Sequence, residues 1–165
     1  MGFEIDNTDF TEEDFNRFSD RLRSNLKALD ILLARPEFGE GDLSFGAELE
    51  LYIVDNEARP LPINQEIIAQ LNDPQLTLEL NRYNLEYNFR PYLLKDCCFS
   101  ATQQEALAAI EKINKCAKQW DGSVVPIGIL PTLQQSDTGY HAMTPLARFK
   151  ALTQELTDIR GGPFT

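Results

Sequence analysis

Glutamate residues alternate with apolar residues along the stretch 43–55. The residues at every second position are apolar: Phe45, Ala47, Leu49, Leu51 and Ile53. Successive side chains of a β-strand point to opposite faces of its sheet, so this pattern predicts a strand with one apolar face. Glu48 and Glu50 then share the opposite face. Because glutamate is depleted in strands, we expect these two acids to have a specific reason to lie there.

A second pair of acids, Glu79 and Glu86, lies in the stretch 76–91, which also alternates. On one straight strand, a separation of seven residues would place the two acids on opposite faces. A turn or bulge near residues 81–84 is therefore needed if both acids are to line one surface. With such a turn, all four glutamates can belong to a single acidic sheet face.

Helical patterns frame these strands. Apolar residues recur at three- and four-residue steps over 11–35 and 102–120, and Asn64 can cap a short helix over 65–71. The pair Thr144–Pro145 indicates the start of a helix that runs to about Arg160, and a short apolar strand is expected over 124–130. The predicted fold class is α+β, an antiparallel β-sheet with helices packed on its apolar face. We expect one domain over 1–165, with a helix and linker at 1–42 and the sheet-and-helix core at 43–165.

The charge balance restricts the ligands. The chain has 26 acidic and 15 basic residues, a net charge of −11, which argues against binding to nucleic acid or to an anionic membrane surface. Cationic ligands, metal ions above all, fit better. No apolar run approaches the roughly 20 residues that span a bilayer, and the N-terminal residues are acidic where a secretory signal is basic. We therefore expect a cytoplasmic protein.

The four glutamates allow two interpretations. Two residues apart on a strand, Glu48 and Glu50 have Cα atoms about 7 Å apart, so their side chains can converge on one cation or straddle two. Like charges on neighbouring strands repel, and a bound divalent ion reverses that repulsion. Oxygen ligands without histidine or cysteine suit Mg²⁺ or Mn²⁺ rather than zinc. The alternative is a solvated sheet face on which some polar positions happen to be glutamate.

The order of these motifs resembles one enzyme family. The G-x-E-x-E strand at 46–50, Glu79 and Glu86 seven residues apart, the run Gly128–Pro131 and the pair Arg160–Gly161 stand in that order. From about Phe45 to Phe164, the chain resembles the N-terminal part of the glutamate–cysteine ligase family, particularly its second bacterial branch of carboxylate–amine ligases.

That resemblance implies a fold related to glutamine synthetase and a reaction. The family joins the γ-carboxylate of glutamate to the amine of cysteine through a γ-glutamyl phosphate, using ATP and Mg²⁺, as the first step of glutathione synthesis. Carried over to this chain, it makes Glu48, Glu50, Glu79 and Glu86 acids that hold the metal or line the substrate pockets. Arg90 would contact a substrate carboxylate or phosphate, or instead form a salt bridge with a neighbouring glutamate.

Three further expectations stay open. The resemblance implies that the chain is the N-terminal part of a longer ligase, inactive or nearly so on its own. The amine acceptor could differ from cysteine, and a non-catalytic acidic module that binds a cation or a protein is the second class of function. An exposed strand edge could also pair with another copy and form a homodimer.

Overall fold

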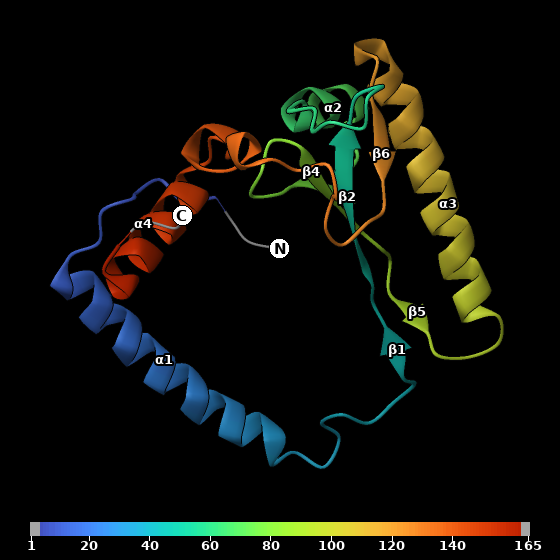
Figure 1. Cartoon of the computed structure of the whole chain (residues 1–165). Helices are drawn as coiled ribbons and strands as arrows, with labels where there is room; N and C mark the ends of the chain where they lie inside the picture. Colours follow the sequence, from blue (N-terminus) through green and yellow to red (C-terminus); the bar gives the residue numbers. More distant parts are fainter. Residues whose placement is uncertain (1–3, 163–165) are drawn as a thin grey trace.

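A four-stranded antiparallel sheet forms the centre of the computed structural model, which describes residues 4–162 (Figure 1). Its strand order is β3-β4-β2-β6, with β2 at Glu48–Val54, β3 at Leu76–Leu78, β4 at Asn84–Asn88 and β6 at Ser123–Val125. A second, two-stranded sheet pairs β1 (Ser44–Phe45) with β5 (Tyr92–Leu93). Together with the helices, these two antiparallel sheets confirm the predicted α+β class.

Four α-helices accompany the sheets in the described part of the chain. They are α1 (Glu12–Leu33), α2 (Asn64–Leu71), α3 (Cys98–Ala117) and α4 (Ala147–Arg160). Short 3-10 turns follow at Lys118–Trp120, Gln135–Asp137 and Tyr140–Ala142. In this part of the chain, no helix combines the length and apolar character needed to cross a membrane.

The core lies between one face of the four-stranded sheet and the helices α2 and α3. Its largest fully buried side chains include Leu51 and Ile53 from β2, Leu85 from β4, Ile67 from α2 and Ile113 from α3. The predicted alternation of β2 is therefore confirmed, since Leu51 and Ile53 are fully buried whereas Glu48 and Glu50 are exposed. The acidic face of the sheet points away from α2 and α3.

The predicted reversal of register between the two acid-bearing strands is confirmed. β3 and β4 form an antiparallel hairpin in which Thr77 lies opposite Glu86 and Leu78 lies opposite Leu85. Directly paired residues of an antiparallel sheet share a face. Glu79, two residues beyond Thr77, therefore lies on the same face as Glu86.

Two predicted strands are shorter than expected. The stretch 43–55 divides into β1 and β2, because β1 pairs with β5 while β2 pairs with β4, and Pro91 between β4 and β5 has no N–H for a continuous ladder. The strand predicted over 124–130 ends at Val125. Pro126 follows, and it likewise cannot donate a hydrogen bond to the neighbouring strand.

Three predicted helix starts are wrong. α3 begins at Cys98, four residues before the expected start. Asn64 is the first residue of α2 and not the cap before it; the cap position is Ile63, and the Asn64 side chain is fully buried. α4 begins at Ala147, after Leu146, so Thr144–Pro145 does not cap it.

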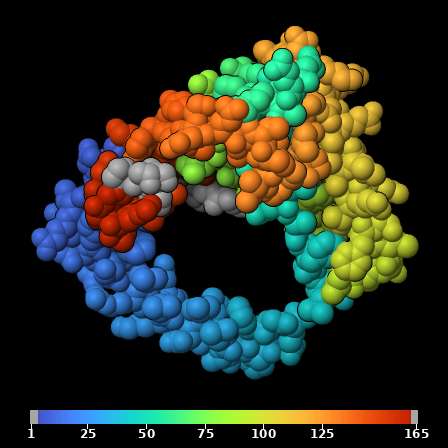
Figure 2. Space-filling view, viewed as in Figure 1, coloured from blue at the N-terminus to red at the C-terminus, as the bar shows by residue number. Residues whose placement is uncertain are grey.

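Helix α1 lies apart from the core and buries none of its residues. Its start is a capping box, in which Asp14 N–H donates to Thr11 Oγ1 and Thr11 N–H donates to Asp14 Oδ2, as its sequence indicates. Figure 2 shows α1 and the linker after it running around an open centre. The apolar stripe of α1, with Phe18 66% exposed and Leu26 52% exposed, faces no other element closely enough to be buried.

Candidate functional site: the acidic sheet face

Glu50 and Glu86 lie directly opposite each other on the paired strands β2 and β4. The next pair along the same face is Glu48 with Asn88, and the pair on the other side is Tyr52 with Asn84. The four predicted glutamates thus share one sheet face. Glu50 and Glu86 form its centre, whereas Glu48 lies two residues before Glu50, at the start of β2.

Glu86 is the most buried of these acids, at 5% exposure. Its Oε1 accepts hydrogen bonds from Asn88 Nδ2 at 2.7 Å and from Thr77 Oγ1 at 3.2 Å. Asn88 Nδ2 also lies 3.2 Å from Thr77 Oγ1. Asn88 Oδ1 is buried and has no hydrogen-bond partner within the described residues. A buried oxygen without a donor is costly, and a cation or a water would satisfy it.

Glu79 completes the cluster from the end of β3. Burial raises the pKa of Glu79, and the nearby Glu86 and Glu50 carboxylates raise it further. The carboxyl group of Glu79, just beyond the end of β3, therefore lies within electrostatic reach of Glu50 on β2 and Glu86 on β4. Because like charges on adjacent strands are unfavourable, the direct pairing of Glu50 with Glu86 carries a repulsion that a bound cation would offset.

The donor chemistry of the face fits a hard divalent cation. Carboxylate and amide oxygens suit Mg²⁺ and Mn²⁺. Within residues 4–162, no three His, Cys, Asp or Glu side chains are arranged to hold a single metal ion by themselves. Mg²⁺ commonly takes only one or two carboxylates, together with waters and substrate phosphates. The Glu50–Glu86 pair matches that incomplete ligand set.

Arg90 lies elsewhere, and its predicted place beside Glu86 is wrong. β4 ends at Asn88, so the strand alternation does not extend to Arg90. Its Nε lies 3.9 Å from Oε1 of Glu105, a residue of α3, which covers the opposite face of the sheet. The alternative of a salt bridge with a glutamate is therefore the one that the structure favours.

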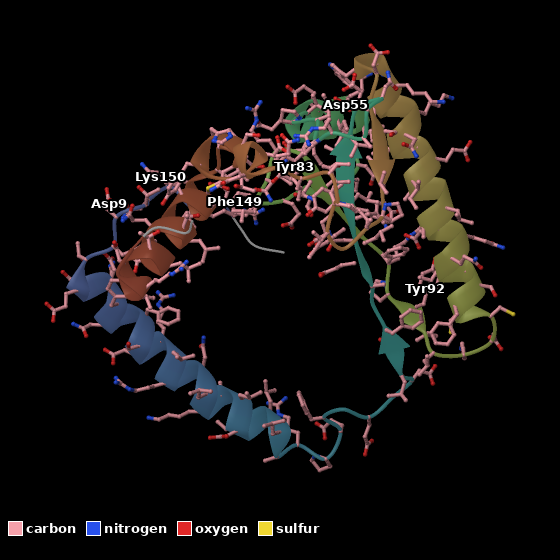
Figure 3. All side chains as sticks on the ribbon, in the orientation of Figure 1. Asp9, Asp55, Tyr83, Tyr92, Phe149 and Lys150 are labelled. Carbon is pink, nitrogen blue, oxygen red and sulfur yellow. The ribbon has the colours of Figure 1, made fainter. Side chains whose placement is uncertain are left out.

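Glu105 is the centre of a polar cluster that the sequence analysis missed. Its carboxylate accepts hydrogen bonds from Tyr87 Oη at 3.2 Å, from Gln75 Nε2 at 2.7 Å and from Tyr92 Oη. Tyr92 lies near the start of α3 (Figure 3). These contacts join β4, β5 and the loop before β3 to α3, so this cluster holds the fold on the face opposite the acids.

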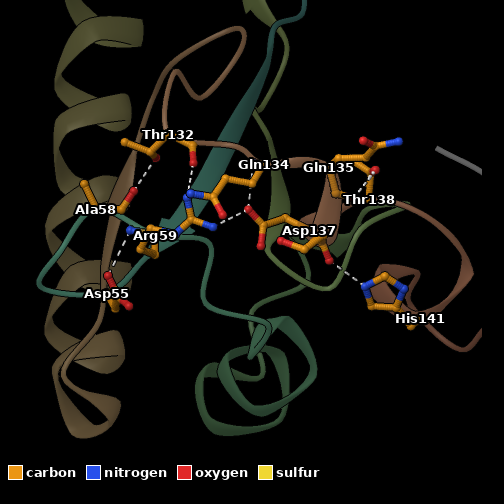
Figure 4. Close-up of polar contacts among 10 residues, drawn as sticks. Asp55, Ala58, Arg59, Thr132, Gln134, Gln135, Asp137, Thr138 and His141 are labelled. Carbon is orange, nitrogen blue, oxygen red and sulfur yellow. Dashed lines mark hydrogen bonds and ion pairs between the residues drawn. The ribbon is translucent and has the colours of Figure 1, made fainter. Parts of the chain in front are cut away.

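A second polar cluster holds the loop after β6 (Figure 4). The guanidinium of Arg59 donates to the carbonyl of Thr132 and forms an ion pair with Asp137, with Nη2 and Oδ2 2.6 Å apart. His141, the one histidine of the chain, is exposed, and its Nε2 lies 2.8 Å from the carbonyl oxygen of Ser136. These contacts position the loop and give His141 a local structural partner.

Comparison with known proteins adds no relative. Searches of family models, curated proteins and solved structures find no match to this chain. The chemistry of the acidic face is therefore the basis for a function.

Proposed function

We propose that this chain is the N-terminal part of an ATP-dependent carboxylate–amine ligase and that its acidic sheet face binds the divalent metal that accompanies ATP. The substrates in this proposal are glutamate and cysteine, as in glutamate–cysteine ligases. The observation that carries it is the direct pairing of Glu50 with Glu86 next to Glu79 on the sheet face opposite α2 and α3. The carboxylates of Glu50 and Glu86 repel each other when no cation is bound, and a bound cation would remove that repulsion.

Each acid has a proposed part in the site. Glu50 and Glu86 would hold Mg²⁺ or Mn²⁺ directly, and Glu48 and Glu79 flank them on the same face. Thr77 and Asn88 orient the Glu86 carboxylate through the hydrogen bonds to its Oε1. When bound, the metal would neutralise the charge of the phosphates during phosphoryl transfer to a carboxylate. Arg90 has no part in this proposal, since it lies beside Glu105.

The main competing function is a non-catalytic module that binds a cation or a cationic partner. The net charge of −11 favours it, because any cation would be attracted to this surface. A ligase that acts on an amine other than cysteine is a variant of the first proposal and would use the same acid cluster. Binding of the metal–nucleotide complex separates a ligase from a simple cation-binding module.

The first test is calorimetric titration of Mn²⁺ and Mg²⁺, with and without ATP, into the chain and into Glu50→Gln/Glu86→Gln. We expect saturable Mn²⁺ binding that the double substitution weakens by about tenfold or more, since both direct ligands lose their charge. Glu57→Gln/Glu66→Gln is the matched control, because it removes two exposed charges at a turn and on α2. Equal binding by all three proteins would contradict the proposed site.

ATP distinguishes the two classes of function in the same titration. The ligase proposal predicts that Mn²⁺ and ATP each strengthen the binding of the other to the wild-type chain. Mn²⁺ binding without any response to ATP would favour the cation-binding module instead. Absence of saturable Mn²⁺ binding by the wild-type chain would contradict both.

The exposed stripe of α1 supports a homodimer. The chain has 11744 Å² of accessible surface, whereas a compact monomer of 18.7 kDa has about 8,300 Å². Stable interfaces bury roughly 800 Å² on each partner, so the excess is ample for one. The stripe consists of exposed apolar residues at helical spacing: Phe15, Phe18, Leu22, Leu26, Leu29 and Leu33. We propose that a second copy of the chain covers it.

Sedimentation velocity over a range of concentrations tests this dimer. We expect a monomer–dimer equilibrium that Leu22→Asp shifts to monomer, because the charge would be buried in the interface. Ser24→Asp adds the same charge to an exposed position of the same helix and should leave the equilibrium unchanged. A wild-type chain that is monomeric throughout, or two variants with the same effect, would argue against α1 as the interface.

A further inference from the structure

We propose that Thr144 is a positioning residue for Glu79: it holds the backbone that carries the Glu79 carboxyl group against the Glu50–Glu86 pair. This inference deepens the proposed function and rests on it for the role of Glu79. Thr144 is 1% exposed and lies 65 residues from Glu79 in the sequence. Its Oγ1 donates a hydrogen bond of 2.6 Å to the carbonyl oxygen of Glu79.

Thr144, before α4, and Arg148, in the first turn of α4, hold three successive carbonyl groups. Arg148 Nη2 donates to Leu78 O at 3.2 Å, Thr144 Oγ1 donates to Glu79 O, and Thr144 N–H donates to Leu80 O at 2.8 Å. β3 ends at Leu78, so Glu79 lies beyond the regular ladder of the sheet. The position of Glu79 is therefore set largely by residues 144–148.

Asn64 connects this contact to the turn between β3 and β4. It is fully buried, and its Nδ2 donates to Thr144 Oγ1 at 2.9 Å and approaches the carbonyl oxygens of Asn81 and Asn84 at 3.2 Å each. The turn that contains these carbonyls reverses the register and brings Glu79 and Glu86 to one face. One buried amide thus fixes the turn and the hydroxyl that holds Glu79.

The chemistry requires a hydroxyl at position 144. A hydroxyl can accept from the Asn64 amide and donate to the Glu79 carbonyl at the same time. Valine has nearly the same shape and can do neither. Serine can do both.

The electrostatics explain why Glu79 needs such an anchor. Glu79 lies two residues beyond Thr77, which pairs with Glu86, so it shares the sheet face of the Glu50–Glu86 pair, and like charges favour its separation from them. On the side of α4, Arg148 contacts the Leu78 carbonyl and lies 3.9 Å from Glu4. A fixed backbone keeps Glu79 on this face against the repulsion, where its charge would add to the attraction for a metal ion held by Glu50 and Glu86.

The test compares Thr144→Val and Thr144→Ser with the wild-type chain. Thr102→Val is the matched control, since the Thr102 hydroxyl donates to the carbonyl of Cys98 within α3, far from the acidic face. The first readout, which needs no metal, is the set of NMR nuclear Overhauser contacts between the side chains of Glu79 and Glu86. The second readout is the affinity for Mn²⁺ alone.

We expect Thr144→Val to lose the Glu79–Glu86 contacts and to weaken Mn²⁺ binding by about tenfold, the order of effect that residues outside the direct ligands have on metal affinity. Thr144→Ser and Thr102→Val should keep both. If Thr144→Val fails to fold, Thr144→Cys replaces it, because the thiol is similar in size and a much weaker donor and acceptor.

Three results would overturn the inference. They are Glu79–Glu86 contacts that persist without the hydroxyl, the absence of these contacts from the wild-type chain, and a serine variant that behaves like the valine variant. Contacts that depend on Thr144 in a chain that does not bind Mn²⁺ would support the anchor and contradict the proposed function. The two failures are therefore distinguishable.

Discussion

Replacing Leu85 with alanine is expected to lower the free energy of unfolding by about 2–5 kcal/mol. Leu85, the second residue of β4, is fully buried and lies opposite Leu51 on β2 and Leu78 on β3. Its side chain belongs to the core against α2 and α3, so truncation removes apolar contacts and leaves a cavity. Domains of this size are stable by about 5–15 kcal/mol, so the loss is a large fraction of the total.

Urea denaturation followed by circular dichroism measures this loss. Leu107→Ala is the matched control, since Leu107 lies on α3 with 60% of its surface exposed. We expect a change within about 0.5 kcal/mol for that variant. Similar losses for the two substitutions would mean that the core does not lie between β4 and the helices α2 and α3.

The sequence alone predicted which side chains of β2 lie on the acidic face, because period-two alternation is a strong local constraint. A shift of one residue would bury Glu48 and Glu50 and expose Leu51 and Ile53, so the register of β2 has one acceptable solution. The pairing of Glu50 with Glu86 follows once the turn at 81–84 reverses the chain. From the sequence, a turn at 81–84 was needed only if Glu79 and Glu86 were to share a face. The structure contains that turn.

Local signals failed where a distant contact competes with them. Thr144 and Asn64 both have the character of helix caps, yet each is used in the buried contact between α2, the turn at 81–84 and the Glu79 carbonyl. Nothing in a single sequence places residue 144 beside residue 79. Side chains of this type bond equally well to their own backbone and to a distant one, and the tertiary structure decides between the two.

Arg90 shows a different limit of sequence patterns. Alternation predicts a face only while a strand continues, and β4 stops two residues before Arg90. Glu105, its partner, lies on a helical segment whose sequence gave no sign of a buried carboxylate. Asn88 also belongs to the acid site, since it donates to the Glu86 carboxylate. The sequence could have indicated this, because Asn88 lies two residues from Glu86 and therefore on the same strand face.

Replacing Glu105 with alanine is expected to lower the free energy of unfolding at pH 7 by about 2–3 kcal/mol, because it leaves the donors of Tyr87 and Gln75 without their carboxylate. Burial acts to raise the pKa of Glu105, but hydrogen bonds from Tyr92, Gln75 and Tyr87 outweigh it and hold this pKa below its ordinary value of 4.5.

The sign of the pH dependence follows from that depressed pKa. The folded state prefers the charged carboxylate more than the unfolded state does, so the contribution of Glu105 is complete above pH 4.5 and is lost as the pH falls through its folded-state pKa. Urea titrations at pH 7 and at about pH 3 should therefore show a difference between the wild-type chain and Glu105→Ala that shrinks on acidification. Glu111→Ala, at an exposed position of the same helix, should show little difference at either pH. A Glu105 effect that stays constant with pH would mean that the charge of the carboxylate contributes nothing and that only the loss of side-chain packing matters.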